Sequence, residues 1–486
     1  MKKVLALGLF LSSMVLSAQE QVKEVVSSNY NRNSVSYVFV ERNQQHASDV
    51  NDFYKTYVVE EKFDHNKIQT QMLQPEVGAT AAKLEDVTAA VNSANLAKEV
   101  VAYIFNRKED GTFDDALLLQ RGLYDAKDQD IKNAGAAKVK DQSYEWGEKL
   151  VDNSYVVVMD IYNTAVKTSD KGTTYTVNAN AHAYKLNGSK DVIDNFYGTA
   201  WADASMSAED KAKAVAAWDA MTFELNHVAT VNVVGVSSTT KLTQGSIYKA
   251  CLSAYESVVF NLEKAIPAWQ VAAPVIATKP IAAKIGTKEG LKNGDRYQAY
   301  SYKEDKNGEL VSVKQGMVRA TVISKNSEVA TGNTEPSFFY QISGAANVKE
   351  GYTLKQKNDL KLGATLSLGL AGSSFRAGLD FDYIAHIAKK GAITYGMLNV
   401  GICGGVFDAA VGAGYGIPLT RFFEITPHVL VGAWTDEEFN PIDYFVEPAV
   451  RLAATFQPFS IGLTAGVRAG QWDPGAVVKF NMKWTF

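Results

Sequence analysis

Histidines are the first residues to consider for chemistry, because an imidazole can hold a metal ion or act as a catalytic base. No two of the histidines stand four residues apart and no HExxH sequence occurs, so their spacing does not predict a zinc site on one helix face. A charged stretch at residues 61–65 contains Glu61, Asp64 and His65, and a solvated turn explains it better than a metal cluster. The six histidines are His46, His65, His182, His227, His386 and His428.

Motifs that cradle phosphates or activate a nucleophile are also missing from the sequence. There is no GxSxG elbow, P-loop or dinucleotide fingerprint, and the GAGYG stretch at residues 412–416 alternates as a strand would. We therefore predict no catalytic, cofactor-binding or metal residues, and a protein that is not an enzyme. An enzyme with scattered catalytic residues stays open as an alternative.

The strongest pattern lies at the C-terminal end. In KFNMKWTF the apolar side chains of Phe480, Met482, Trp484 and Phe486 alternate with polar ones, which indicates a strand with one apolar face. The last 127 residues hold 17 of the 36 glycines, and the same alternation recurs through them. It predicts eight strands, at about residues 360–370, 375–383, 392–402, 407–416, 422–434, 444–456, 459–468 and 476–486.

The composition of the two strand faces favours a transmembrane barrel over a water-soluble one. Eight strands of roughly ten residues suit a bilayer crossing, and the apolar faces carry aromatic residues toward the strand ends. The other faces hold small residues and a few charges of both signs, as a narrow interior would. The predicted interior charges are Arg376, Asp380, Asp382, Asp408, Glu424, Glu447, Arg451, Arg468, Lys479 and Lys483.

An eight-stranded barrel is only wide enough for its own side chains, so we predict a barrel that is closed rather than a pore. Pro427 and Pro448 interrupt two of the expected strands, and we expect bulges or a distorted ladder there. The alternate connections between strands are short, which favours a working surface in the residues before the barrel.

This C-terminal part resembles the small eight-stranded outer-membrane barrels of Gram-negative bacteria. The resemblance implies outer-membrane lipid as a partner, and it implies that Phe480, Met482, Trp484 and Phe486 form the signal read by the outer-membrane insertion machinery. It also implies that both chain ends face the periplasm. The long N-terminal part is similar to envelope proteins of unknown function from the Bacteroidetes.

The N-terminus has the character of a signal peptide, residues 1–18. Lys2 and Lys3 precede 13 mainly apolar residues, whereas a retained membrane helix would need about 20. Cys251 and Cys403 are expected to be buried thiols rather than a disulfide. The net charge of −4, with basic residues scattered, gives no support for nucleic-acid binding.

Residues 19–270 are predicted to form an α/β or α+β region, because helical and strand patterns interleave. Helices are expected at residues 83–107 and 244–267, and strands at 34–41, 153–163, 175–186 and 224–237. A proline-containing linker then leads to a small β domain at 271–357, and the barrel occupies 358–486.

The sequence leads to one principal expectation of function. We expect a structural or scaffolding protein that the barrel anchors in the outer membrane, with its periplasmic modules presented to an envelope protein or to peptidoglycan. The alternative is a periplasmic small-molecule or lipid-binding protein whose ligand lies between the α/β region and the β domain.

Overall fold

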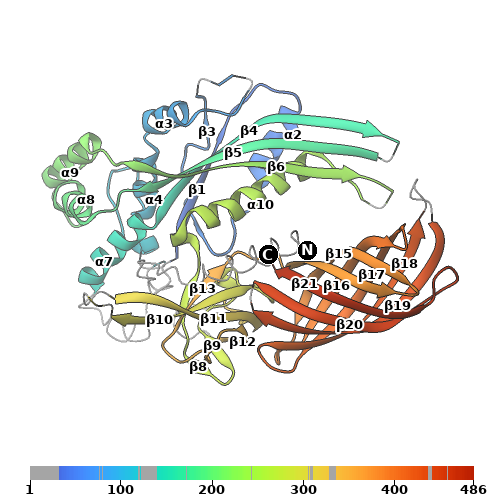
Figure 1. Ribbon diagram of the computed structural model, residues 1–486. Coiled ribbons are helices and arrows are strands. Elements are labelled where there is room, and N and C mark those ends of the chain that lie inside the picture. Colours follow the sequence, from blue (N-terminus) through green and yellow to red (C-terminus); the bar gives the residue numbers. More distant parts are fainter. Residues whose placement is uncertain are drawn as a thin grey trace.

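The computed structural model describes residues 32–75, 77–78, 80–118, 121, 139–170, 172–241, 243–304, 306, 310–327, 335–435, 441–456 and 458–485. The expected signal peptide and the terminal Phe486 lie outside these residues. Along the chain follow an α/β region, a curled antiparallel sheet and a closed barrel of eight antiparallel strands (Figure 1). The predicted multidomain fold, with α/β, small β and barrel parts, is confirmed.

The α/β region is built on a six-stranded sheet in the order β2-β1-β4-β5-β6, with β3 also paired to β1. Strand β1 runs parallel to β2, β3 and β4, whereas β4, β5 and β6 are antiparallel. The strands are β1 (Ser34–Val40), β2 (Asp64–His65), β3 (Met72–Leu73), β4 (Ser154–Ser169), β5 (Gly172–Leu186) and β6 (Leu225–Thr239).

Helices cover both faces of this sheet, and each face has its own apolar core. Residues of β1 alternate between the two cores: Val35, Tyr37 and Phe39 pack beneath α2 and α10, whereas Val38 and Val40 pack on the other side. The helices are α2 (Ala47–Thr56), α3 (Leu84–Ser93), α4 (Leu96–Ile104), α7 (Val139–Asp152), α8 (Lys190–Asn195), α9 (Ala208–Ala220) and α10 (Ile247–Ala265), with a π-helical turn η1 (Phe196–Ala200).

The single helix expected at residues 83–107 is wrong. The chain forms α3 and α4 instead, and Asn95 between them takes a left-handed conformation with φ of 51°. Leu96, the first residue of α4, is fully buried. Apolar spacing continues across the break, so the pattern alone did not reveal it.

The curled sheet has seven strands in the order β7-β13-β10-β11-β12-β9-β8. Its core includes Tyr297, Val318, Phe339 and Leu354. Two 3-10 turns, η2 (Pro267–Trp269) and η3 (Thr287–Glu289), flank its first strands. The strands are β7 (Ala272–Pro274), β8 (Ala277–Thr278), β9 (Ile281–Ala283), β10 (Arg296–Glu304), β11 (Leu310–Val322), β12 (Ser337–Ser343) and β13 (Thr353–Lys357).

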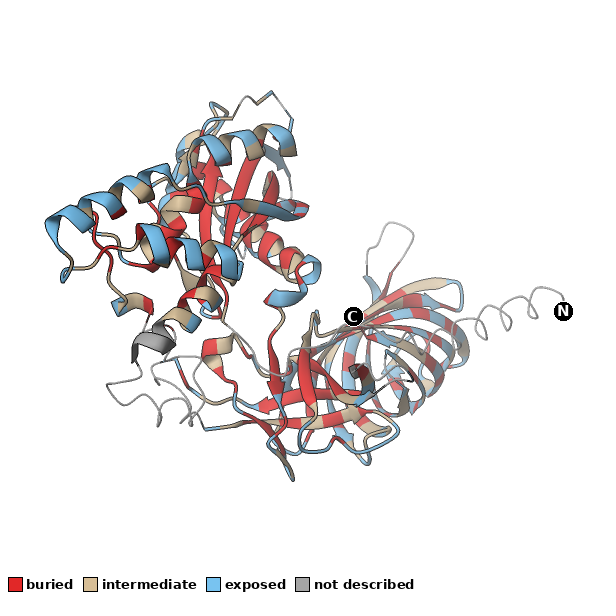
Figure 2. Ribbon diagram, turned by 90° about the vertical axis from the view of Figure 1, so that its left-hand side faces the viewer, coloured by how far each residue is buried: buried red, intermediate tan, exposed pale blue. Residues whose placement is uncertain are grey.

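The barrel closes where its first strand pairs with its last, for example Leu368 with Phe480. Buried and exposed residues alternate along its strands (Figure 2), so one set of side chains fills the interior and the other faces outward. The strands are β14 (Leu362–Ala371), β15 (Ser374–Ile387), β16 (Ile393–Cys403), β17 (Val406–Pro418), β18 (Phe423–Thr435), β19 (Pro441–Phe456), β20 (Phe459–Gly470) and β21 (Gly475–Thr485).

Pro427 and Pro448, the two prolines for which a distortion was predicted, lie beside gaps in the hydrogen-bonded ladder. Pairing of β17 with β18 skips Pro427, between the pairs Gly414–His428 and Ile417–Ile425. Pairing of β19 with β20 skips Pro448 in the same way. The register is the same on both sides of each gap, so the ladder is distorted as expected but neither proline forms a bulge.

Candidate functional site

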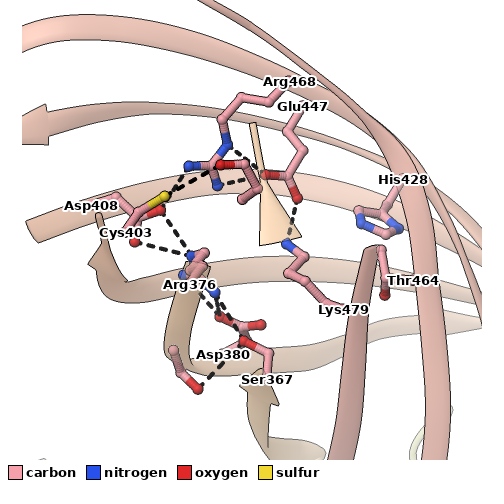
Figure 3. Close-up of polar contacts among 12 residues, drawn as sticks. Ser367, Arg376, Asp380, Cys403, Asp408, His428, Glu447, Thr464, Arg468 and Lys479 are labelled. Carbon is pink, nitrogen blue, oxygen red and sulfur yellow. Dashed lines mark hydrogen bonds and ion pairs between the residues drawn. The ribbon is translucent and has the colours of Figure 1, made fainter. Parts of the chain in front are cut away.

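A chain of ion pairs with alternating charge runs through the barrel interior (Figure 3). Arg376 contacts Asp408 at 2.8 Å and Asp380 at 3.3 Å. Asp408 also contacts Arg468 at 3.0 Å, and Arg468 contacts Glu447 at 2.6 Å. Glu447 then accepts from Lys479 at 2.5 Å, so each charge in the chain has an opposite neighbour.

A second cluster lies nearer the curled sheet. Arg451 Nη1 and Lys483 Nζ each lie 2.8 Å from Asp382 Oδ2. Glu424 accepts from the Tyr395 hydroxyl at 3.0 Å and from the Thr426 hydroxyl at 2.7 Å. Two cations and two carboxylates thus share this end of the interior.

The structure places all ten predicted interior charges inside the barrel. Eight are buried, and the side chains of Glu424 and Lys483 are partly buried. Five cations balance five carboxylates, so the set carries no net charge. Arg468 also lies over the Phe445 ring, 4.0 Å from its centroid, which fills the interior further. These paired charges occupy the interior of an eight-stranded barrel, which is only wide enough for its own side chains.

Other predicted residues take structural positions. The buried His428 lies 3.1 Å, through Nδ1, from the Thr426 carbonyl oxygen, and Cys251 and Cys403 are buried free thiols. Asp64 pairs with Arg32 at 2.8 Å, and His65 lies near the Tyr57 hydroxyl. Among the described residues, no three His, Cys, Asp or Glu side chains are grouped closely enough to hold a metal ion.

The outward face of the barrel is apolar. Of the 37 exposed large apolar residues in the described chain, 29 belong to the barrel and its connections. Aromatic side chains flank this band at both ends. Near the curled sheet they are Tyr383, Tyr415, Phe423, Phe456 and Trp484, and at the far end Phe375, Tyr444 and Trp472. Tyr383 and Phe375 are eight residues apart on β15, which corresponds to about 20 Å along the axis of a tilted barrel.

The last strand contributes to this outward face. Phe480 and Trp484 are 43% and 38% exposed, and Met482 is partly buried. On the other side of the strand, Lys479, Asn481 and Lys483 point into the interior network. Phe486 lies outside the described residues.

The curled sheet covers the near end of the barrel. Arg319, Tyr340 and Ile342 of the curled sheet line a cavity of about 70 Å³ together with barrel residues such as Tyr395 and Lys483. Such a volume holds only a few water molecules. This contact was not predicted from the sequence, because the residue pattern of the curled sheet and that of the barrel each reflect only the strands within that part.

Specific hydrogen bonds fix the curled sheet to the barrel. The Asn293 side chain donates to the Ile387 carbonyl at 2.8 Å and accepts from the Ile387 amide at 2.8 Å. Lys361 donates to the Asn293 carbonyl at 2.5 Å, and Arg421, in a barrel connection, bonds to Asn347. These bonds join segments far apart in the sequence into one unit.

A cleft of about 650 Å³ lies between the α/β region and the curled sheet. Apolar residues Val58, Phe260 and Leu291 line part of it. Glu60 also lines it and accepts from the Tyr255 hydroxyl at 3.0 Å. Glu263 at its wall is ion-paired with Lys62.

Two carboxyl groups of the cleft have altered acidity. Burial raises the pKa of Glu60 above its ordinary value, although Tyr255 and Lys62 act in the opposite direction. Burial likewise raises the pKa of Asp295, against the effect of Lys361, whose Nζ lies 3.1 Å away. Perturbed carboxyls in a cleft are a feature of binding sites, although ion-pair networks also produce them.

The fold therefore defines a class: a closed eight-stranded antiparallel barrel preceded by an α/β region and a curled sheet that covers the barrel's end. No protein-family model and no curated protein matches the chain. Within the part of the chain that the structure describes, no helix is long and apolar enough to cross a membrane.

Proposed function

We propose that the barrel anchors this protein in a bacterial outer membrane and that the preceding residues form a periplasmic scaffold for an envelope partner. The observation that carries the proposal is the distribution of polarity in the barrel. Apolar side chains face outward between two sets of aromatic residues, while the charges are inside and paired. A water-soluble barrel has the reverse arrangement, and so large an exposed apolar surface would promote aggregation.

Fractionation of cells tests the anchoring. The protein should remain with the outer membrane after washing in high salt, and its unheated form should migrate differently from its boiled form on a denaturing gel. Recovery in the soluble periplasm, with identical migration before and after boiling, contradicts the proposal. The signal peptide and the outer-membrane insertion machinery belong to the same proposal, because only an exported chain can be inserted from the periplasm.

The proposal includes a barrel that does not conduct ions. It is supported by the ion-pair chain across the interior and by the curled sheet at the near end. In a planar lipid bilayer the full chain should give no stable conductance steps. Reproducible steps that persist after further purification contradict a closed barrel.

A membrane position also sets a requirement on the α/β region. In the view of Figure 1, the hairpin of β4 and β5 extends along the length of the barrel. Lipid would occupy that depth, and the polar residues of the hairpin would not be stable there. The region joins the curled sheet covalently only through the segment 266–271. We therefore infer that the α/β region turns away from the barrel when the barrel enters the membrane. The distance between labels at Thr168 and Tyr444 should then be longer in vesicles than in detergent.

The scaffolding role is tested by finding what the periplasmic part contacts. Photo-cross-linking in intact cells from positions on the α/β region should capture one recurrent envelope protein, or peptidoglycan. Matched positions on the outward face of the barrel should yield lipid instead. If cross-linking from the α/β region captures no recurrent partner, the scaffolding role is contradicted.

The cleft between the α/β region and the curled sheet favours a second function, the binding of a small molecule or lipid. Its volume of about 650 Å³ is within the range of ligand sites, and it combines apolar walls with polar groups. Native mass spectrometry of the extracted full chain should then reveal a bound molecule, and Leu291→Arg should remove it. Val166→Arg, on the α/β hairpin outside the cleft, is the control. A chain that carries no molecule contradicts this second function.

A further inference from the structure

Another cleft lies within the α/β region, beside α4, and has a volume of about 700 Å³. We call it the α4 cleft. It is lined by one side of α4, by the segment 67–69 and by Trp218 of α9. None of its lining residues belongs to the cleft between the α/β region and the curled sheet, so the two cavities are separate. Its volume is within the range of small-molecule sites.

The α4 cleft is positively charged. Its lining contains the cations Lys67, Lys98 and Arg107 and a single carboxylate, Glu99. Glu99 already accepts two hydrogen bonds from Thr70, one from the amide at 2.9 Å and one from the hydroxyl at 2.6 Å. The lining therefore has an excess of positive charge, which attracts anions.

Arg107 has no strong anionic partner among the described residues. Its Nε is buried, and these residues offer it no hydrogen-bond acceptor. Its Nη2 lies 3.9 Å from Asp219, whose side chain is 69% exposed, so water weakens this ion pair. A buried donor without an acceptor is costly, and a guanidinium group can bind a carboxylate or phosphate through two donors. Arg107 is therefore well suited to hold an anionic group.

A buried indole ring holds two of the cations in the same part of the cleft. Lys98 Nζ lies 5.2 Å and Arg107 Cζ 5.4 Å from the ring centroid of Trp218, which is 3% exposed. Lys98 donates to the Asp219 carbonyl oxygen at 3.0 Å, and its ammonium group has two further N–H donors. Burial lowers the pKa of Lys98, and Arg107 acts in the same direction, against the effect of Asp219. A bound anion would offset the repulsion between the two cations.

The lining also includes apolar side chains. Ile68 is buried, and Tyr103 and Leu117 are half-buried. Ligand sites commonly combine such walls with a few polar groups that fix the orientation of the ligand. The α4 cleft can thus hold a carbon skeleton next to an anionic group.

We propose that the α4 cleft binds a small organic anion, whose carboxylate or phosphate group is held by Arg107 and Lys98 and whose carbon skeleton lies against the apolar walls. Carboxylate and phosphate both present a pair of oxygens to a guanidinium group. The site is additional to the scaffold and to the cleft at the curled sheet, and it does not depend on the membrane position of the barrel.

Isothermal titration calorimetry of the full chain in a neutral detergent tests the site. Phenyl phosphate or phenylacetate should bind to saturation, and the tighter of the two identifies the anionic group. Benzyl alcohol, which has no charge, should not bind. Inorganic phosphate should bind more weakly than phenyl phosphate because it has no apolar part.

Substitutions assign the binding to the α4 cleft. Arg107→Gln should weaken it by about tenfold, as the loss of a hydrogen bond to a charged group would. Lys98→Gln should weaken it as well. Lys213→Gln makes the same change of charge at an exposed residue of α9 outside the cleft, and it should bind like the parent. Unchanged circular dichroism of each variant shows that it folds.

Chemical labelling provides a second measurement, which needs no variant. The bound aromatic anion should slow the acylation of Lys98 by acetic anhydride several-fold, as measured by mass spectrometry of the peptides. The acylation of Lys213 should not change.

Three results would each overturn the anion site: no saturable binding of either aromatic anion, equal affinity of Arg107→Gln and the parent, or acylation of Lys98 at the same rate with and without the anion. Equal binding of benzyl alcohol and phenyl phosphate would also overturn it. Equal binding of inorganic phosphate and phenyl phosphate would overturn the role of the apolar walls.

Discussion

Asn293 and Ile387 are joined by two hydrogen bonds, one in each direction between the Asn293 side chain and the Ile387 main chain, each of 2.8 Å. One residue belongs to the curled sheet and the other to the end of β15. The pair holds the curled sheet at a fixed position on the barrel. In the proposed scaffold the curled sheet is therefore the rigidly held part, whereas the α/β region turns on the segment 266–271.

Replacing Asn293 should loosen this connection without unfolding either part. Asn293→Ala removes both bonds and leaves the Ile387 amide without this partner, so we expect a loss of about 1–3 kcal/mol in the docking of the curled sheet. It also removes a bond of 2.7 Å from the Asn293 side chain to the Thr321 carbonyl oxygen within the curled sheet. Limited proteolysis in detergent should cut the curled sheet several times faster in the variant. Asn347→Ala, which removes a more exposed contact with Arg421, should have a smaller effect. Equal cleavage of the Asn293 variant and the parent would contradict the role of this pair.

Asp408 should be among the most important residues for barrel stability. It is buried and pairs with both Arg376 and Arg468, so Asp408→Asn leaves two buried guanidinium groups short of negative charge. We expect the barrel to lose about 3–5 kcal/mol. The temperature at which the unheated gel form converts to the boiled form measures this loss. Lys390→Ala, in an exposed turn, is the control, and equal conversion temperatures for the two variants would refute the network's role.

Glu60 should make the stability of the α/β region depend on pH. Its pKa in the folded chain is above the ordinary value of 4.5 because of burial. The folded state therefore binds the proton more tightly than the unfolded state. This stabilisation is fully present below pH 4.5 and is lost as the pH rises through the folded-state pKa.

Thermal unfolding of the α/β region as a function of pH measures this effect. Glu60→Gln should flatten the fall in unfolding temperature above pH 4.5. Glu256→Gln, on the exposed side of α10, should retain the parent's profile. A Glu60→Gln profile identical to the parent's would contradict the assignment.

The end of the chain should decide whether the barrel is assembled. Phe486→Asp is expected to reduce insertion into the outer membrane at least several-fold, because it replaces the terminal aromatic residue of the proposed signal. Immunodetection of the heat-modifiable form in outer-membrane fractions measures insertion. Thr485→Ser, a conservative change at the neighbouring position, should insert like the parent. Normal assembly of Phe486→Asp would contradict the proposed insertion signal but not the barrel fold.

Much of the barrel could be predicted because its strands alternate with a period of two, which is visible in any single strand. The interior set could be predicted for the same reason, since it follows from the face on which each charge lies. Which of these interior charges pair with each other could not be predicted. Asp382 pairs with Arg451, 69 positions away, through a register and stagger that involve every strand between them. Tyr395, which binds Glu424, was also missed, because the predicted interior set contained only charged residues.

In the N-terminal part, local sequence pattern predicts single helices and strands but neither a break within a helix pattern nor the contacts between parts. Its four long strands and α10 follow from local pattern, whereas the two-residue strands β2 and β3 do not. Asn95 divides an apolar helix pattern that has no glycine or proline to reveal a break. The docking of the curled sheet depends on single polar residues such as Asn293, in a turn sequence that would serve equally well in isolation. Contacts between parts of a chain leave no periodic signal, so they require the structure.

The most direct test of the central claim is the environment of a nitroxide spin label at Val429, in the middle of β18 and 48% exposed on the outward face. The full chain, reconstituted in phospholipid vesicles, should give a label that relaxes strongly with dissolved oxygen and weakly with a water-soluble nickel chelate, as lipid contact requires. A label at Val58, 78% exposed in the α/β region, should show the reverse. Strong relaxation by the nickel chelate at both positions would contradict a barrel that spans the membrane.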